Sequence, residues 1–200
     1  MPKKPLAKIV LIGYRGSGKS TVGRRLAERL SLPFIDTDTL IEEKTGITIK
    51  EMVEKKGWPY FRAVEKEVIR GLAGDKTMVV AAGGGAVLDP ENQARLKENG
   101  LVFYLAADEA TLSGRIAKDA RTGDQRPSLT GEMVTAEIRT VLKTREPIYR
   151  KVADYMINTV GRTVNDIVEE IIGIVMAKFE NRSTKSEIIS NDRNEKFKTN

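Results

Sequence analysis

Hydrophobic residues in this chain gather in five short runs that are typical of buried β-strands. The runs are residues 8–12, 33–35, 77–82, 101–106 and 154–157. Between them, apolar residues recur at the three- and four-residue spacing of amphipathic helices. Strands that alternate with helices in this way are typical of a parallel sheet covered on both faces. The pattern therefore predicts an α/β fold.

Helical segments separate the predicted strands, and several carry clear start or stop signals. Thr48 and Glu51 have capping-box spacing, and Gly57 is expected to end the helix that they begin. Pro59 suits the first turn of the next helix, whereas Pro147 is expected to bend or interrupt a later one. The predicted helices cover residues 21–30, 48–57, 59–72, a segment that begins at Asp89-Pro90, 135–144 and 163–177.

Two segments lack this periodicity. Residues 118–131 are polar and rich in Gly, Pro and Arg, which predicts a mobile surface loop. Beyond about residue 180 the chain has few apolar residues, so we expect 181–200 to be a disordered tail unless a partner orders it. Residues 1–180 are long enough to form one domain with a substantial core.

The segment between the first strand and the first helix reads GYRGSGKS and matches the phosphate-binding pattern G-x-x-x-x-G-K-[ST]. Its glycines let backbone N–H groups point into one concavity beside the positive end of a helix, where the lysine reaches phosphates and the serine hydroxyl binds Mg²⁺. The other interpretation is an ordinary glycine turn followed by a chance Lys-Ser pair. The flanking strand and helix favour nucleoside triphosphate binding by Gly13, Gly16, Ser17, Gly18, Lys19, Ser20 and Thr21.

Composition narrows the chemistry. The 200 residues include no cysteine and no histidine, so thiolate nucleophiles and Cys-bound metals are excluded, and proton transfer falls to carboxylates or lysine. No apolar stretch approaches the length of a membrane span, and the start MPKKPLAK lacks the apolar part of a secretory signal, so we expect a cytoplasmic protein. The net charge of +6 would allow nucleic-acid binding, but acidic residues are interspersed and no nucleic-acid-binding signature appears.

Two carboxylates follow the second predicted strand, in the segment Asp36-Thr37-Asp38. This position is the carboxyl end of a strand, where open parallel sheets bind ligands. One carboxylate could hold the water shell of Mg²⁺, and the other could accept a hydrogen bond from a substrate hydroxyl. The alternative is helix capping, since Thr39 and Glu42 have capping-box spacing. Next to a phosphate loop, the functional interpretation is favoured.

Three further features are ambiguous when each is taken alone. Gly83-Gly84-Gly85 would let a ligand approach the main chain, or form merely a tight turn. Arg62 and Glu65 could be an exposed ion pair of small value. Arg145 and Tyr149, four residues apart, could lie on a solvated helix face.

Six segments, taken in order along the chain, resemble the motifs of the shikimate kinase family. They are GYRGSGKS, FIDTD, YFR with Glu65 downstream, GGGAV, an arginine loop with Arg126-Pro127, and REPIYR. The resemblance covers residues 8–177, and the combination is much narrower than the phosphate loop alone. It implies a P-loop NTPase three-layer sandwich with strand order 2-3-1-4-5, similar to nucleoside-monophosphate kinases. It also implies substrate-binding helices at about 38–72 and a lid at about 118–131.

The family's functional residues carry over by motif. The resemblance implies that Asp36 serves the magnesium site with Ser20, that Asp38 binds and positions or deprotonates the attacking hydroxyl, and that Lys19 and the lid's Arg126 approach the transferring phosphoryl group. It further implies a set that binds the shikimate carboxylate and lines its pocket, namely Arg62, Glu65, Gly83, Gly84, Gly85 and Arg145.

On the adenine side, the resemblance implies that Arg121 packs on the adenine ring. The loop at 158–164 lacks the proline that some family members have there, which leaves an adenine contact by Arg162 open. The implied activity is Mg²⁺-dependent transfer of the γ-phosphoryl group of ATP to the 3-hydroxyl of shikimate, by a protein expected to be a monomer. Two other hypotheses are a related small-metabolite kinase, such as one acting on gluconate, and a nucleotide-dependent switch without catalysis.

Overall fold

A computed structural model describes residues 8–72, 76–118 and 134–178 of the chain. The expected lid, with Arg121 and Arg126, and the expected tail lie outside the described residues.

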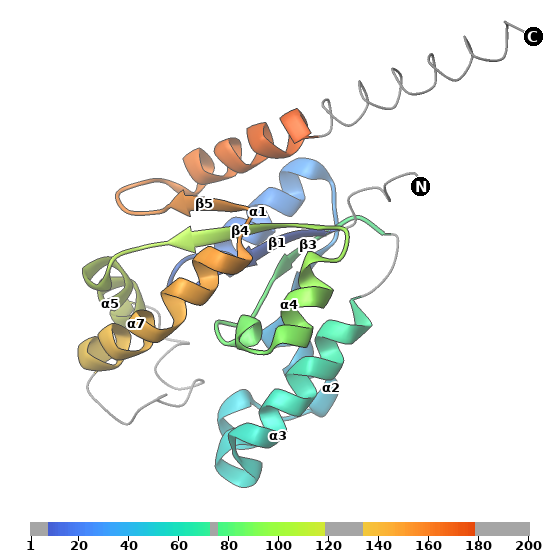
Figure 1. Ribbon diagram of the computed structural model, residues 1–200, viewed down its shortest axis with the longest axis vertical. Helices are drawn as coiled ribbons and strands as arrows, with labels where there is room; N and C mark the ends of the chain where they lie inside the picture. Colours follow the sequence, from blue (N-terminus) through green and yellow to red (C-terminus); the bar gives the residue numbers. More distant parts are fainter. Residues whose placement is uncertain (1–7, 73–75, 119–133, 179–200) are drawn as a thin grey trace, which may run out of the picture.

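One sheet forms the centre of the molecule (Figure 1). Its strands are β1 (Lys8–Ile12), β2 (Phe34–Asp36), β3 (Met78–Ala81), β4 (Gly100–Ala106) and β5 (Tyr155–Asn158). All neighbours pair in parallel, in the order β2-β3-β1-β4-β5. The predicted parallel sheet and its strand order are therefore confirmed. No strand end differs from its predicted position by more than one residue.

Helices cover both faces of the sheet (Figure 1). Val10 and Ile12 of β1 pack in a cluster with side chains of one helical layer, whereas Ile9 and Leu11 face the other layer. The alternation follows from the two-residue period of a strand, which sends successive side chains to opposite faces. The first layer contains α3 (Ile49–Gly71), α4 (Pro90–Lys97), α5 (Glu109–Lys118) and α7 (Val134–Val152); the second contains α1 (Lys19–Leu30) and the helix at 164–178. This is the expected three-layer sandwich.

A helical arm projects beside the sheet, made of α2 (Thr37–Thr45) and α3 (Figure 1). The capping box at Thr48 and Glu51 is present, as predicted, and begins α3. At Gly57 the backbone leaves helical geometry, with φ 78° and ψ 167°, so the expected break is confirmed even though helix resumes at once. Burial of Met52 and Phe61, one on each side of the break, against Ile41 holds the arm together.

Two local features of the helices qualify what the sequence predicts. The first turn of α2 is capped by Asp36, whose side chain accepts a hydrogen bond from the Asp38 N–H, and not by Thr39. Helix α7 is not interrupted at Pro147, although the proline removes the N–H that would bond to Lys143. Apolar side chains on both sides of Pro147, such as Val141 and Val152, are buried in the core and hold the helix in place. None of the described helices is both long and apolar enough to span a bilayer.

Candidate active site at the carboxyl edge of the sheet

The phosphate-binding pattern occupies the turn between β1 and α1. Its three glycines all have positive φ angles, 143° at Gly13, 77° at Gly16 and 96° at Gly18. At Gly13 a Cβ atom would lie 2.7 Å from the Leu105 carbonyl oxygen of β4, so only glycine fits. The backbone is thus free to curl into the concave loop that the sequence predicts, at the start of a helix whose positive end favours anions.

Lys19 is largely buried, with 8% of its surface exposed. Its ammonium group donates a 2.8 Å hydrogen bond to the Tyr14 carbonyl oxygen, within the same loop. The positive charge therefore lies over the loop and not in bulk solvent. This is the position that the predicted phosphate contact requires.

The segment Asp36-Thr37-Asp38 joins three parts of the site, the start of α1, the start of α2 and the turn after β3. Asp36 Oδ2 accepts a 2.5 Å hydrogen bond from the Ser20 hydroxyl, and Asp36 Oδ1 accepts one of 3.1 Å from the Asp38 N–H. Thr37, between the two aspartates, is fully buried and accepts a 2.8 Å hydrogen bond from the Gly83 N–H. The segment therefore both caps a helix and presents polar groups to the site, so the two interpretations of its sequence are compatible.

Oxygen donors of this kind suit Mg²⁺, which binds proteins through one or two carboxylates and keeps several waters. Ser20 and Asp36 supply a hydroxyl and a carboxylate already in contact. Within the described residues no cluster of three or more acidic side chains could form a closed metal cage. The pair thus fits an ion that is shared with waters and a phosphate.

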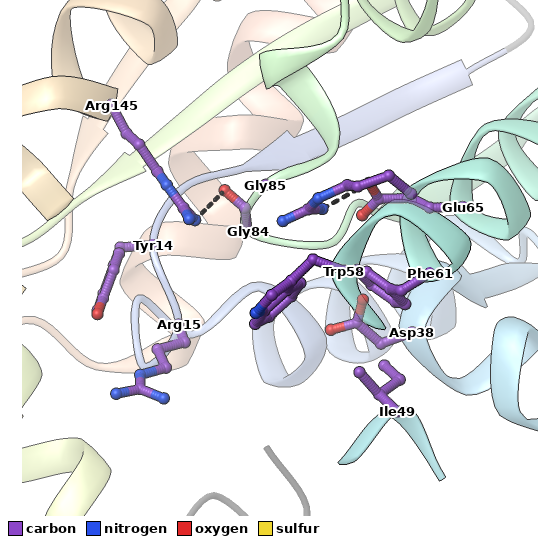
Figure 2. A pocket seen from close by; sticks show the side chains of 11 residues that line it. Tyr14, Arg15, Asp38, Ile49, Trp58, Phe61, Glu65, Gly84, Gly85 and Arg145 are labelled. Carbon is purple, nitrogen blue, oxygen red and sulfur yellow. Dashed lines mark hydrogen bonds and ion pairs between the residues drawn. The ribbon is translucent and has the colours of Figure 1, made fainter. Parts of the chain in front are cut away.

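An open pocket lies beside the phosphate loop (Figure 2). Its walls come from the phosphate loop, the helical arm, the turn after β3, and α7: Tyr14, Arg15, Asp38, Ile49, Trp58, Phe61, Arg62, Glu65, Gly84, Gly85 and Arg145. Six of the eleven are residues that the sequence assigned to the acceptor site. The structure therefore brings Asp38, Arg62 and Arg145 to one cavity from three segments, of which the first and last are 107 positions apart.

The Arg62–Glu65 pair is not an ordinary exposed ion pair. Arg62 Nη1 donates a 2.6 Å hydrogen bond to Glu65 Oε2, and the Glu65 side chain is 1% exposed. Burial raises the pKa of Glu65, and the neighbouring Arg62 guanidinium opposes that rise. Among the described residues, Glu65 Oε1 has no hydrogen-bond partner. An orphaned buried oxygen in a pocket wall is suited to accept a hydrogen bond from a ligand hydroxyl or water.

The glycine triplet lets polar groups approach the main chain. A Cβ atom at Gly83 would lie 2.5 Å from Asp38 Oδ1 and 2.9 Å from Glu65 Oε1, and one at Gly85 would overlap the Arg62 guanidinium. Any side chain at these positions would displace the carboxylates or the arginine. The triplet is therefore more than a tight turn.

Arg145 and Tyr149 reach the same turn from α7. Arg145 Nη1 donates a 3.3 Å hydrogen bond to the Gly84 carbonyl oxygen, and the Tyr149 hydroxyl donates one of 2.5 Å to the same atom. Tyr149 is fully buried, and burial raises the pKa of its phenol. The alternative of a solvated helix face is therefore wrong for this pair.

Sequence reasoning missed several residues of the site. Tyr14 and Arg15 both donate to the buried carboxylate of Glu137 in α7, and burial raises the pKa of Tyr14 to about 12. They occupy variable positions of the phosphate-binding pattern, so the motif carries no information about them. The chain's one tryptophan, Trp58, also lines the pocket. In the sequence it stands between Gly57 and Pro59, which indicate a helix end and a helix start but predict no ligand contact.

The loop after β5 also lies near the phosphate loop. Arg115 of α5 donates a 2.8 Å hydrogen bond to the Thr159 carbonyl oxygen and a longer one to that of Gly16. Arg162 bonds to the Asn158 carbonyl oxygen and pairs with Glu170 on the surface. The adenine contact of Arg162 stays a prediction, as do the roles of Arg121 and Arg126, which lie outside the described residues.

Comparisons with known proteins agree with this geometry. The family model described as shikimate kinase matches residues 15–175. A shikimate kinase from Syntrophus aciditrophicus is 45% identical over 172 residues, covering 82% of this chain and 88% of that protein. The structure of a shikimate kinase from Acinetobacter baumannii in complex with shikimate superposes with a TM-score of 0.80 at 38% identity, covering 88% of this chain and 96% of that one.

A gluconokinase from Sinorhizobium meliloti is more distant, with a TM-score of 0.53 at 21% identity over 90% of this chain and 98% of that one. That likeness shows a shared fold alone. The family match, the relatives and the arrangement of the pocket agree, and this chain belongs to the shikimate kinase family.

Proposed function

We propose that this protein transfers the γ-phosphoryl group of ATP to the 3-hydroxyl of shikimate, giving shikimate 3-phosphate and ADP for aromatic amino-acid biosynthesis. The observation that carries the proposal is the single pocket in which Asp38, Arg62 and Arg145 meet beside Lys19 of the phosphate loop. Family membership narrows the acceptor to shikimate.

The acceptor is a small anionic polyol, and the pocket offers a partner for each of its parts. Arg62 and Arg145 bind the carboxylate, since a planar guanidinium can donate two parallel hydrogen bonds to it. Asp38 and the unpartnered oxygen of Glu65 accept hydrogen bonds from the hydroxyls. The Trp58 ring provides an apolar wall for the carbon ring.

Phosphoryl transfer needs mainly alignment and charge neutralisation. The loop N–H groups and Lys19 hold the β- and γ-phosphates, and Asp38 orients the attacking hydroxyl and accepts its proton. The hydroxyl oxygen then bonds to the γ-phosphorus as the bond to the leaving ADP oxygen breaks. Ser20 and Asp36 would hold Mg²⁺, which supplies neutralisation of phosphate charge when bound.

Further parts of the proposal concern the lid and the state of the enzyme. Arg126 approaches the transferring group and Arg121 the adenine when the lid closes, which excludes water and limits wasteful ATP hydrolysis. We propose that the enzyme acts as a monomer. We place the enzyme in the cytoplasm, where ATP is available, without a nucleic-acid or membrane partner.

An acceptor panel tests the proposal. Purified protein with ATP and Mg²⁺ is offered shikimate, quinate and gluconate in parallel, and ADP release is followed by a coupled assay. Of the three acceptors, we expect only shikimate to give rapid ADP release. Preference for gluconate would favour the related small-metabolite kinase, and ATP binding without acceptor-dependent ADP release would favour the non-catalytic switch.

A further inference from the structure

We propose that Tyr149 is a positioning residue for the acceptor pocket: its hydroxyl fixes the carbonyl of Gly84 so that Arg145 can turn from that carbonyl to the carboxylate of the acceptor. The inference rests on the proposed function, because it assigns Arg145 to the acceptor. It adds a residue that does not line the pocket and that the sequence left as a possible surface tyrosine.

Two donors from α7 converge on one acceptor atom. Tyr149 bonds to the Gly84 oxygen at 2.5 Å, whereas Arg145 bonds to it at 3.3 Å, near the upper limit for a hydrogen bond (Figure 2 shows the Arg145 contact). Of the two contacts, the phenol makes the shorter one. The carbonyl therefore keeps a good partner when the arginine leaves.

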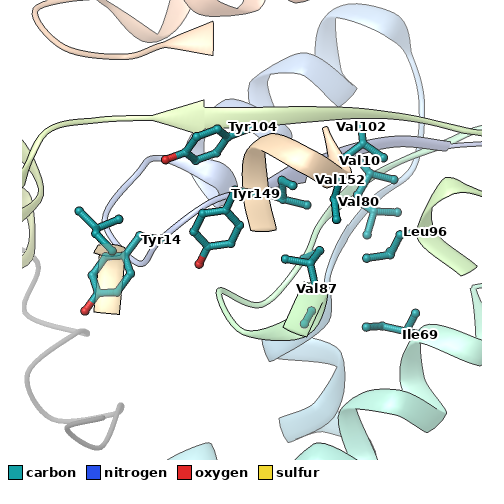
Figure 3. Packing of buried hydrophobic residues seen from close by; sticks show 14 of the residues in the cluster. Val10, Tyr14, Ile69, Val80, Val87, Leu96, Val102, Tyr104, Tyr149 and Val152 are labelled. Atoms are coloured by element: carbon teal, nitrogen blue, oxygen red, sulfur yellow. The ribbon is translucent and has the colours of Figure 1, made fainter. Parts of the chain in front are cut away.

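The packing of Tyr149 makes its hydroxyl a fixed point. Its side chain is fully buried, and its ring stacks on that of Tyr104 with centroids 5.2 Å apart and planes at 30° (Figure 3). Tyr104 belongs to the central region of the sheet, on β4 beside β1. The phenol is thus held by the core, while the Arg145 side chain lies at the edge of the pocket.

The turn that Tyr149 holds lies directly against the phosphate loop. A Cβ atom at Gly84 would lie 3.5 Å from the Gly13 carbonyl oxygen and 3.6 Å from the Arg15 nitrogen. A Cβ atom at Gly83 would likewise meet the carboxylates of Asp38 and Glu65, and one at Gly85 would meet Arg62. Because the turn is enclosed between α7 and the phosphate loop, the position of its middle carbonyl sets where the acceptor lies relative to the phosphates.

Loss of the phenol hydroxyl would leave Arg145 as the donor to the Gly84 carbonyl. With Tyr149→Phe, the Gly84 carbonyl keeps Arg145 as its donor, because leaving a partly buried carbonyl unpaired costs free energy. The arginine is then bound to the turn, and the acceptor must compete for it. The cost should therefore appear in acceptor binding and not in nucleotide binding.

The test compares Tyr149→Phe with Tyr104→Phe in the full chain. Both variants remove one hydroxyl from the same stacked pair, and the described contacts of Tyr104 include no hydrogen bond to the glycine triplet. We expect Tyr149→Phe to raise the KM for shikimate about tenfold and leave the KM for ATP within about twofold. We expect Tyr104→Phe to leave both constants unchanged. A wild-type KM for shikimate in Tyr149→Phe would overturn the inference, and so would an equal rise in Tyr104→Phe.

A double variant separates positioning through Arg145 from a general structural effect. In an Arg145→Ala background, adding Tyr149→Phe should raise the KM for shikimate by less than about twofold, since the residue through which the phenol acts is gone. A further tenfold rise would contradict the inference. A purely structural defect would lower the active fraction and the melting temperature without moving KM.

A measurement on the intact fold does not depend on the stability of these variants. The protein is labelled with 3-fluorotyrosine, and the resonances of its five tyrosines are assigned by substituting the four other than Tyr149 one at a time. Saturating shikimate should shift the ¹⁹F resonance of Tyr149 more than that of Tyr104, because the phenol becomes the main donor to Gly84. An unshifted Tyr149 resonance, in a protein that phosphorylates shikimate, would refute the inference while the proposed function stands. Failure of the wild-type protein to bind or phosphorylate shikimate would instead refute the proposed function.

Discussion

Ser20 at the start of α1 donates its hydroxyl hydrogen to Asp36 at the end of β2, with 2.5 Å between the oxygens. The contact joins the end of the phosphate loop to the point where β2 ends and α2, which carries Asp38, begins. Because the same carboxylate caps α2 through its other oxygen, its structural role and its proposed metal-binding role can be separated by substitution.

Asp36→Asn should impair the use of Mg²⁺ with little loss of stability. Asparagine caps helices as well as aspartate does and keeps a side-chain oxygen for the Asp38 N–H, but it lacks the negative charge that favours a divalent ion. We expect the Mg²⁺ concentration for half-maximal activity to rise about tenfold, while the free energy of unfolding changes by less than about 1 kcal/mol. Activity titrated with Mg²⁺ checks this, and an unchanged midpoint would remove Asp36 from the metal site.

Lys19→Ala should lower kcat by a factor of about 100 to 1,000, because a fixed cation beside the transferring group is lost. Lys97→Ala is a matched control, since Lys97 also donates to a backbone carbonyl, that of Val152, away from the site. Steady-state kinetics and thermal unfolding of both variants give the comparison. Near-normal turnover in Lys19→Ala would refute its assignment.

Arg62→Ala should raise the KM for shikimate at least about tenfold and spare the KM for ATP. The substitution also leaves Glu65 buried without its cation, which costs stability. Arg62→Lys retains a positive charge near Glu65 but cannot donate two parallel hydrogen bonds to a carboxylate. It should therefore recover stability without recovering KM. Recovery of both by lysine would mean that Arg62 acts through Glu65 and not on the acceptor.

The raised pKa of Glu65 predicts a pH-dependent stability. The folded protein holds the Glu65 proton more tightly than the unfolded chain does, so this contribution is complete below the reference pKa of 4.5 and is lost as the pH rises through the folded value. Glu65→Gln cannot ionise. Between about pH 4 and pH 8, the unfolding free energy of wild type should therefore fall relative to that of the variant. Denaturant titrations at a series of pH values measure the difference, and parallel profiles would contradict it.

Local signals in the sequence predicted much of the fold because each depends on few neighbours. The break at Gly57 needs only a positive φ, and the capping box at Thr48 needs only a residue three positions on. Pro147 does not interrupt α7, because burial of side chains on both sides of it outweighs one lost hydrogen bond.

The same limit applies to the site. Motif spacing could place Asp38, Arg62 and Arg145 on their elements, but not their partners. Tyr149 resembles any tyrosine four residues from an arginine until the fold places a glycine carbonyl at its hydroxyl. Glu137, 122 positions from Arg15, offers no local signal at all. Contacts between distant segments are set by tertiary packing, which a local pattern does not encode.

The most direct test of the account is the identity of the product. Wild-type protein is incubated with ATP, Mg²⁺ and shikimate, and the products are examined by ³¹P–¹H correlation spectroscopy. We expect a phosphate monoester coupled to the proton at carbon 3 of shikimate, formed in equal amount with ADP. ADP with inorganic phosphate alone, or a phosphate on another hydroxyl, would contradict it.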